Sequence, residues 1–282
     1  RMMVHLTLLA ALLPSPARED AQTLLLRVVE NQERNQELQR QYTYIETVRT
    51  EDRRKDGTAT RREEETFEVT PAPGGEYRRL IARYGQPLTQ NEQKKEEEKF
   101  RKYIEQRIKL SPEELQDKNE NLKRRVGRFE SRVREALEVF EFSALPDEDL
   151  SGRRVRVFEF SPRPTYKPHS RATKLLHQTE GTVWIDPDRN QIAKLHIRFR
   201  NDMKFALGLF GRISTGTEAV AQQVHLGDEI WLLDRVDVFL KGRFYFIKKY
   251  NRHLTFSYTD YKKYTVSTEE TVATHTTAKH PR

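Results

Sequence analysis

The sequence contains no cysteine, and it has only three methionines and two tryptophans among 282 residues. The absence of cysteine excludes disulfide bonds, thiolate catalysis, cysteine-ligated metal sites and lipid attachment through an N-terminal cysteine. Glycine and proline are scarce too, at 12 residues each, and no stretch rich in glycine and serine divides the chain. We therefore expect one continuous domain over residues 18–268.

The motifs of common catalytic and cofactor sites are also missing. There is no serine nucleophile elbow, no glycine-rich phosphate loop and no dinucleotide fingerprint. None of the eight histidines pairs with another across one helical turn beside a glutamate, and alternation places His196 and His253 on the solvent side of strands. The sequence therefore predicts no catalytic residues, no cofactor and no metal site.

Charge of either sign is abundant but not segregated. The 51 lysines and arginines against 43 aspartates and glutamates give a formal net charge of +8, with both signs interspersed. Such a balance permits binding to nucleic acid or anionic lipid but demands neither. No recognition helix, zinc-finger spacing or aromatic RNA-binding signature accompanies it, so the sequence predicts no nucleic-acid partner.

Long apolar runs are absent as well. The longest, Leu6 to Leu13 (LTLLAALL), is too short to cross a bilayer as a helix, and the small residues Ser15 and Ala17 follow at the positions that a signal peptidase reads. We interpret residues 1–17 as a secretory signal peptide, the alternative being an ordinary first helix. The threonine-rich, patternless residues 269–282 predict a disordered tail.

The periodicity of apolar residues predicts an α+β fold. A helix is expected over residues 20–41, then a hairpin of 42–54 and 58–69 around Asp56-Gly57, and a third strand over 76–84. About half of residues 90–141 are charged, and narrow apolar stripes there predict two or three helices, one of them starting at Ser111-Pro112. Eight further strands are expected over 153–161, 179–186, 191–201, 204–210, 218–226, 229–240, 243–250 and 253–264.

Apolar and polar residues alternate strictly along the later strands, which implies one apolar and one solvent-exposed face for the whole sheet. About ten or eleven strands are enough for an antiparallel sheet to curl strongly under its own twist, giving an unclosed barrel capped by helices. Its concave side is either filled by these helices or left open as a cavity for an acyl chain. The candidate lining residues are Val183, Ile185, Leu195, Ile197, Phe199, Val236, Val238, Leu240, Leu254 and Phe256.

A glycine-punctuated aromatic run, Met203 to Gly211, does not alternate cleanly. It is predicted either as a flexible rim at the mouth of the cavity or as a buried central strand. The candidate rim residues are Phe205, Leu207, Leu209 and Phe210.

The order of these elements resembles the LolA-like outer-membrane lipoprotein-sorting superfamily, and is most similar to uncharacterised exported members from Acidobacteria-type genomes. The matching pieces span most of residues 20–265. They are Pro73-Gly74-Gly75-Glu76-Tyr77-Arg78-Arg79-Leu80 with Gly85-Gln86-Pro87-Leu88, Val183-Trp184-Ile185-Asp186, Glu229-Ile230-Trp231-Leu232 and Tyr258-Thr259-Asp260-Tyr261-Lys262-Lys263-Tyr264.

The resemblance implies an unclosed β-barrel with helices over an apolar cavity, a periplasmic location, and a lipid or lipoprotein acyl chain as the bound partner. The charged insertion at 90–141 is longer than in the short carriers. We therefore expect a non-covalent lipid carrier or sensor of the cell envelope, compatible with peripheral membrane contact. The alternative is an envelope scaffold with a filled core that binds a protein partner through the helices of 90–141.

Overall fold

The structure is a computed structural model that describes residues 20–54, 56–72, 75–205, 211–226, 230–244 and 248–264. The strands are β1 (Tyr42–Arg53), β2 (Ala59–Ala72), β3 (Gly75–Arg83), β4 (Gln86–Pro87), β5 (Phe140–Leu150), β6 (Arg153–Pro162), β7 (Thr179–Asp186), β8 (Gln191–Phe199), β9 (Met203–Phe205), β10 (Gly211–Ile213), β11 (Glu218–Leu226), β12 (Ile230–Phe244) and β13 (Lys248–Lys263). The helices are α1 (Ala21–Glu30), α2 (Gln32–Gln39), α3 (Gln90–Ile108), α4 (Pro112–Val139) and α5 (Arg171–Leu176).

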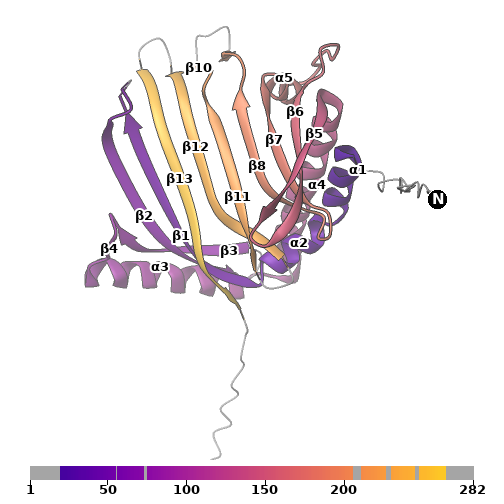
Figure 1. Cartoon of the computed structure of the whole chain (residues 1–282). Helices are drawn as coiled ribbons and strands as arrows, with labels where there is room; N and C mark the ends of the chain where they lie inside the picture. Colours follow the sequence, from indigo (N-terminus) through magenta and orange to yellow (C-terminus); the bar gives the residue numbers. More distant parts are fainter. Residues whose placement is uncertain are drawn as a thin grey trace, which may run out of the picture.

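In the described ranges the strands form one antiparallel sheet in the order β4-β3-β2-β1-β13-β12-β11-β8-β7-β6-β5 (Figure 1). The short strand β10 adds to the end of β12 and pairs in turn with β9. β1 lies against β13, so the first and last strands are neighbours in the middle of the sheet. β4 and β5 are its two edges, and the sheet is therefore open rather than closed into a barrel.

The helices start where the sequence supplies caps. Ser111 accepts from the Glu114 N–H while Glu114 accepts from the Ser111 N–H, and Pro112 occupies the first helical position of α4. Thr89 and Glu92 form the same reciprocal pair at the start of α3. The predicted helix start at Ser111-Pro112 is confirmed.

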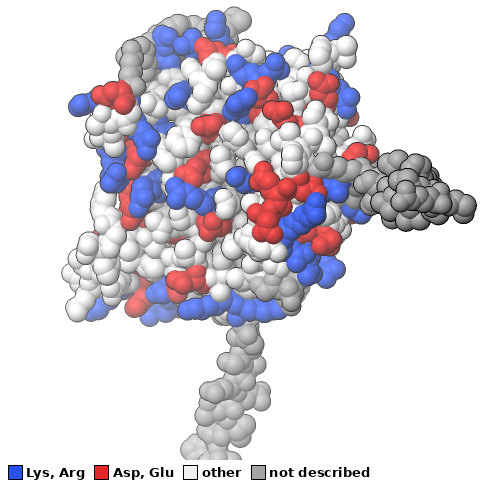
Figure 2. Space-filling view, viewed as in Figure 1, with Lys and Arg blue, Asp and Glu red and all other residues white. Residues whose placement is uncertain are grey.

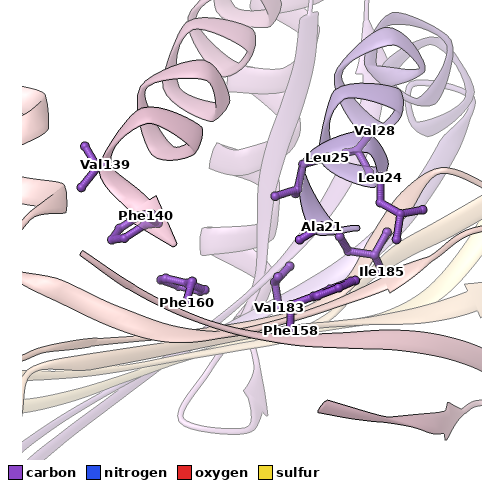
Figure 3. Close-up of a cluster of buried hydrophobic side chains, with 10 residues drawn as sticks. All are labelled: Ala21, Leu24, Leu25, Val28, Val139, Phe140, Phe158, Phe160, Val183 and Ile185. Atoms are coloured by element: carbon purple, nitrogen blue, oxygen red, sulfur yellow. The ribbon is translucent and has the colours of Figure 1, made fainter. Parts of the chain in front are cut away.

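The main core lies where α1 and α4 pack on one face of β6, β7 and β8 (Figure 3). The apolar side of α1 directs Leu24, Leu25 and Val28 toward this face, and Phe158 and Ile185 lie beneath them. Leu24 and Ile185 are completely buried, and full burial of such a side chain contributes roughly 2 kcal/mol. α1, α4 and α5 thus gather at the β5–β8 end of the sheet (Figure 1).

Two smaller clusters close other parts of the sheet. Val155, Val157, Trp184, Ala193 and Trp231 pack on the opposite face of β6, β7 and β8. Tyr42, Ile230 and Leu232 form the third cluster together with Leu38 of α2. The β6–β8 end of the sheet is therefore covered on both faces.

Several predicted boundaries differ from the structure. The predicted helix over 20–41 breaks at Asn31, whose side-chain amide donates a 2.7 Å hydrogen bond to the Arg189 carbonyl. The apolar stripe of the insertion ends at Val139, and β5, which was not predicted, begins at Phe140. α5, β4 and β10 were also missed, so the described ranges contain 13 strands rather than ten or eleven.

The prediction of a turn between two strands at Gly242 is wrong, because β12 continues to Phe244. A β-carbon at Gly242 would lie 2.2 Å from the Arg212 carbonyl oxygen and 2.5 Å from the Tyr250 hydroxyl. Glycine is needed there for the close approach of β10 and of the Tyr250 ring. The predicted break between residues 250 and 253 is wrong too, since β13 runs unbroken from Lys248 to Lys263.

No helix within the described ranges is long and apolar enough to cross a membrane. The predicted signal peptide (1–17) and tail (269–282) lie outside the described residues.

Candidate functional site

Apolar side chains form continuous rows across the central strands. In one row Val48, Phe256, Val236, Ala221 and Leu195 are direct neighbours on β1, β13, β12, β11 and β8. Neighbours in register point to the same face of a sheet, so the row is one surface. We call this surface the central apolar face and extend it to the parallel row that lies two residues further along each strand. That second row consists of Thr50, Leu254, Val238, Ala219 and Ile197.

On β13 and on part of β1, side chains of the central apolar face are more accessible than their neighbours on the polar face. On β13, Leu254 and Phe256 are half-buried, whereas Thr255 between them points to the opposite face and is only 5% exposed. On β1, Val48 and Thr50 are half-buried, and Glu51 on the opposite face is 8% exposed. In an ordinary sheet the apolar side chains would be the better covered ones.

The helices explain why this face is accessible only in the middle of the sheet. The cluster under α1 and α4 includes Leu195 and Ile197 of β8 among its partly buried neighbours. Within the described part of the chain, it includes no residue of β11, β12 or β13. The face therefore continues from the helix-covered core onto strands whose apolar side chains remain half-buried.

The opposite face of the same strands is closed by a polar network. Asp237 accepts from His253 Nε2 at 2.8 Å, from Thr255 Oγ1 at 3.0 Å and from Arg235. Arg53 reaches His253 Nδ1 at 3.2 Å and also pairs with Glu51. Acidic and basic side chains interleave over the strands in Figure 2 rather than gathering into a patch of one sign.

Donor chemistry fixes the protonation of His253 in this network. A guanidinium has only donors, so His253 Nδ1 accepts from Arg53 and the ring proton resides on Nε2, which donates to Asp237. Burial alone would raise the pKa of Asp237, but the hydrogen bonds from Arg235, His253 and Thr255 outweigh it and lower the pKa to about 2. Thr255, His253 and Asp237 do not form a relay, because Thr255 and Asp237 both contact Nε2 of His253.

Both ends of the central apolar face are polar. Beyond Thr50 and Leu254, Arg252 pairs with Asp52 at 2.7 Å, and the end beyond Val48 carries Glu46. Glu46 lies two residues before Val48 on the same side of β1, is 8% exposed, and pairs with Arg78 of β3 at 2.5 Å. The Arg78 guanidinium also lies 4.2 Å from the centre of the Phe67 ring. Tyr258, the cross-strand partner of Glu46, has its pKa raised to about 12 by burial and by the charge of Glu46. Burial and nearby carboxylates raise the pKa of Tyr44 as well.

The structure brings most of the predicted lining residues together on one face. Leu195, Ile197, Val236, Val238, Leu254 and Phe256 belong to the central apolar face, and Leu240 and Phe199 extend it by one further residue pair along β12 and β8. Val183 and Ile185 share this face but lie in the core beneath α1, at 3% and 0% exposure. They are covered because the apolar side of α1 packs directly on β7. Sequence reasoning missed Val48, Ala219 and Ala221, although alternation within β1 and β11 indicates them.

The predicted rim is described only at Phe205, whose backbone belongs to β9. Leu207, Leu209 and Phe210 lie outside the described residues. One other sequence interpretation changes: His253 is not a plain surface residue but part of the polar network. His196 remains on the polar side of β8, where its Nε2 donates a 3.1 Å hydrogen bond to Glu218. Among the described residues, no three His, Asp or Glu side chains lie together as metal ligands would.

Comparisons with known proteins add limited information. No model of a protein family matches the sequence, and no curated protein matches it. Solved structures similar to the chain include a domain named for outer membrane lipoprotein sorting from Vibrio parahaemolyticus, at 11% identity and a TM-score of 0.33, with 89% of this chain and 96% of that chain covered.

Two further structures are similar at the same level. A LolA superfamily protein from Nitrosomonas europaea shows 9% identity and a TM-score of 0.30, covering 89% of this chain and 96% of that one. A DUF1329 family protein from Desulfovibrio piger shows 9% identity and a TM-score of 0.31, covering 87% and 94%. These scores are too low to assign a family, so the geometry described above must support any function.

Proposed function

We propose that this chain is an exported carrier or sensor that binds a lipid or lipoprotein acyl chain non-covalently on the central apolar face. The observation that supports the proposal is that apolar side chains of the central strands remain accessible to solvent. Leu254 and Phe256 remain half-buried while Thr255 behind them is closed off. An accessible, continuous apolar surface on a monomeric protein usually marks a binding site.

The chemistry of the two rows favours an acyl chain over a polar ligand. From β1 to β8 they contain aliphatic, alanine and phenylalanine side chains, with Thr50 as the one polar member and no charge. Each buried methylene of the ligand contributes roughly 0.8 kcal/mol to the free energy of binding. About ten of them give a large favourable contribution, which is opposed by the entropy lost when the ligand is ordered. Binding of this kind needs no catalytic group, and the proposal includes no reaction.

The cellular setting is part of the proposal. The apolar run and small residues near the N-terminus favour export to the periplasm, where an acyl chain needs a carrier to cross water. Membership of the LolA-like superfamily, including its Acidobacteria-type branch, is proposed on the sequence pieces quoted above. A protein partner bound through α3 and α4, with peripheral membrane contact, belongs to the same setting.

The test is to ask what the protein holds when it is purified. The mature chain is isolated from a membrane-free extract without detergent, denatured, extracted and analysed by mass spectrometry. The proposal predicts about one acyl lipid per chain, lost when Val238 is replaced by Asp. A folded protein with neither co-purified lipid nor any binding of a fluorescent fatty acid would instead favour the envelope scaffold with a filled core.

A further inference from the structure

The end of the central apolar face at β1 and β3 holds an exposed cation, Arg78. The Arg78 side chain is 44% exposed, while the side chain of its partner Glu46, two residues from Val48 on β1, is only 10% exposed. Residues two apart on one side of a strand are about 7 Å apart, so the Arg78 charge sits at the edge of the apolar rows. The adjacent Arg79 points to the other face of β3, where it pairs with Glu68.

The guanidinium of Arg78 has donors to spare. It has five N–H groups, and its contacts among the described residues are the Glu46 carboxylate, made through Nη2, and the face of the Phe67 ring. The ring contact covers one side of the guanidinium, and the carboxylate contact is made through one nitrogen, so N–H groups remain for a second acceptor. The planar guanidinium binds the oxygens of a carboxylate or phosphate group more strongly than an uncharged donor does.

The charges of Arg78 and Glu46 determine which headgroups the site prefers. An anionic oxygen that binds Arg78 must share it with Glu46, so Glu46 weakens the site while it holds the guanidinium in place. A neutral headgroup can accept a hydrogen bond from the guanidinium but forms no ion pair with it, so it gains less than an anionic one. Tyr258, whose pKa burial and Glu46 raise, keeps its hydroxyl proton and adds no competing negative charge.

We propose that Arg78 is the headgroup-recognising residue of the site and selects single-chain amphiphiles that end in an anionic oxygen group, either a carboxylate or a phosphate. The inference rests on the proposed acyl-chain function. It assigns the orientation of the ligand: the chain lies over β1, β13, β12, β11 and β8, and the head lies at Arg78. Arg79 makes a matched control, since it is the neighbouring arginine with a glutamate partner on the opposite face.

The experiment uses a neutral fluorescent probe, N-phenyl-1-naphthylamine, displaced by three competitors of equal chain length below their micelle concentrations. Palmitate, hexadecyl phosphate and hexadecanol differ only in the headgroup. Palmitate or hexadecyl phosphate is expected to compete at least about fivefold better than hexadecanol, the order expected for a partly exposed charge-assisted hydrogen bond. The ratio of the two anions tells which headgroup the site prefers.

The variants test the headgroup assignment separately from the acyl-chain function. R78Q is expected to remove the advantage of the anions and leave hexadecanol unchanged, and R79Q is expected to change neither. E46Q keeps the hydrogen-bonding shape but removes the competing charge, so the anions should compete about threefold better. Equal competition by all three amphiphiles, or an equal effect of R78Q and R79Q, would overturn the headgroup assignment alone. Failure of the neutral probe to bind would overturn the acyl-chain function itself.

Discussion

The indole nitrogen of Trp231 donates a 2.9 Å hydrogen bond to Asp186 Oδ2, and neither side chain is exposed to solvent. The same carboxylate accepts from Arg153 Nε at 2.8 Å and from the backbone N–H groups of residues 188 and 189. One buried aspartate thus joins β6, the β7–β8 turn and the start of β12. This junction fixes the end of the sheet on which α1 packs.

Replacing Asp186 by alanine should destabilise the protein by about 3 kcal/mol, because it leaves the buried Trp231 N–H without an acceptor and removes the nearer carboxylate of Arg153. Urea unfolding measures the loss. The matched control is D188A, which removes an exposed carboxylate 3.4 Å from the same arginine and should cost less than about 0.5 kcal/mol. Equal effects of the two variants would contradict the structural role of Asp186.

The Asp237 network predicts a specific pH dependence. The pKa of Asp237 is lowered from 3.8 to about 2 in the folded state, so its ionised form contributes stability that is fully present above about pH 4. This contribution falls as the pH drops from about 4 to 2, because the proton then binds the unfolded chain first. Wild type should exceed D237N by about 1 to 2 kcal/mol at pH 6, and the difference should shrink toward pH 2. A difference independent of pH would contradict the assignment.

Gly181 is predicted to tolerate no side chain. A β-carbon there would lie 1.9 Å from the His196 carbonyl oxygen and 2.8 Å from the Phe160 ring. G181A should therefore lose about 3 kcal/mol or more of stability, measured as a fall in the thermal midpoint. The adjacent T182A, at a half-buried position on the other face, should cost about 1 kcal/mol or less. A G181A protein as stable as wild type would contradict the register of β7 and β8.

Ala221 offers a test of the binding surface that adds bulk rather than charge. It lies between Val236 and Leu195 in the first apolar row and is half-buried. A221F should fill part of the space above β11 and lower the affinity for a fluorescent fatty acid about tenfold, while adding apolar area that keeps the protein folded. Unchanged affinity in a folded A221F protein would show that the ligand does not lie over β11.

The sequence predicts this fold well where the signals are local. Alternation gave the faces of β8, β12 and β13, and the Asp56-Gly57 and Ser111-Pro112 signals located a hairpin and a helix start. Gly242 was misread because its role depends on the approach of Arg212 and Tyr250, which are distant in the sequence. β5 was missed because Phe140 continues the helical apolar spacing of α4 up to the point where the chain becomes extended.

The candidate site was predictable in composition but not in assembly. Alternation identifies Val238 and Leu254 as members of an apolar face, since the rule acts within one strand. That β1 pairs with β13, so that Val48 adjoins Phe256, joins residues about 200 positions apart and has no local signature. The His253 network was missed for the same reason, because Arg53 and Asp237 reach that ring from other strands.

The central claim is most directly tested by titrating a fluorescent fatty acid into wild type and two asparagine variants. V238N places an amide on the central apolar face, and V220N places the same group on the opposite face of β11, which pairs with β12 and β8. We predict saturable binding near one probe per chain, weakened about tenfold or more by V238N and unchanged by V220N. Equal affinities in both variants, or no saturable binding to wild type, would contradict the account.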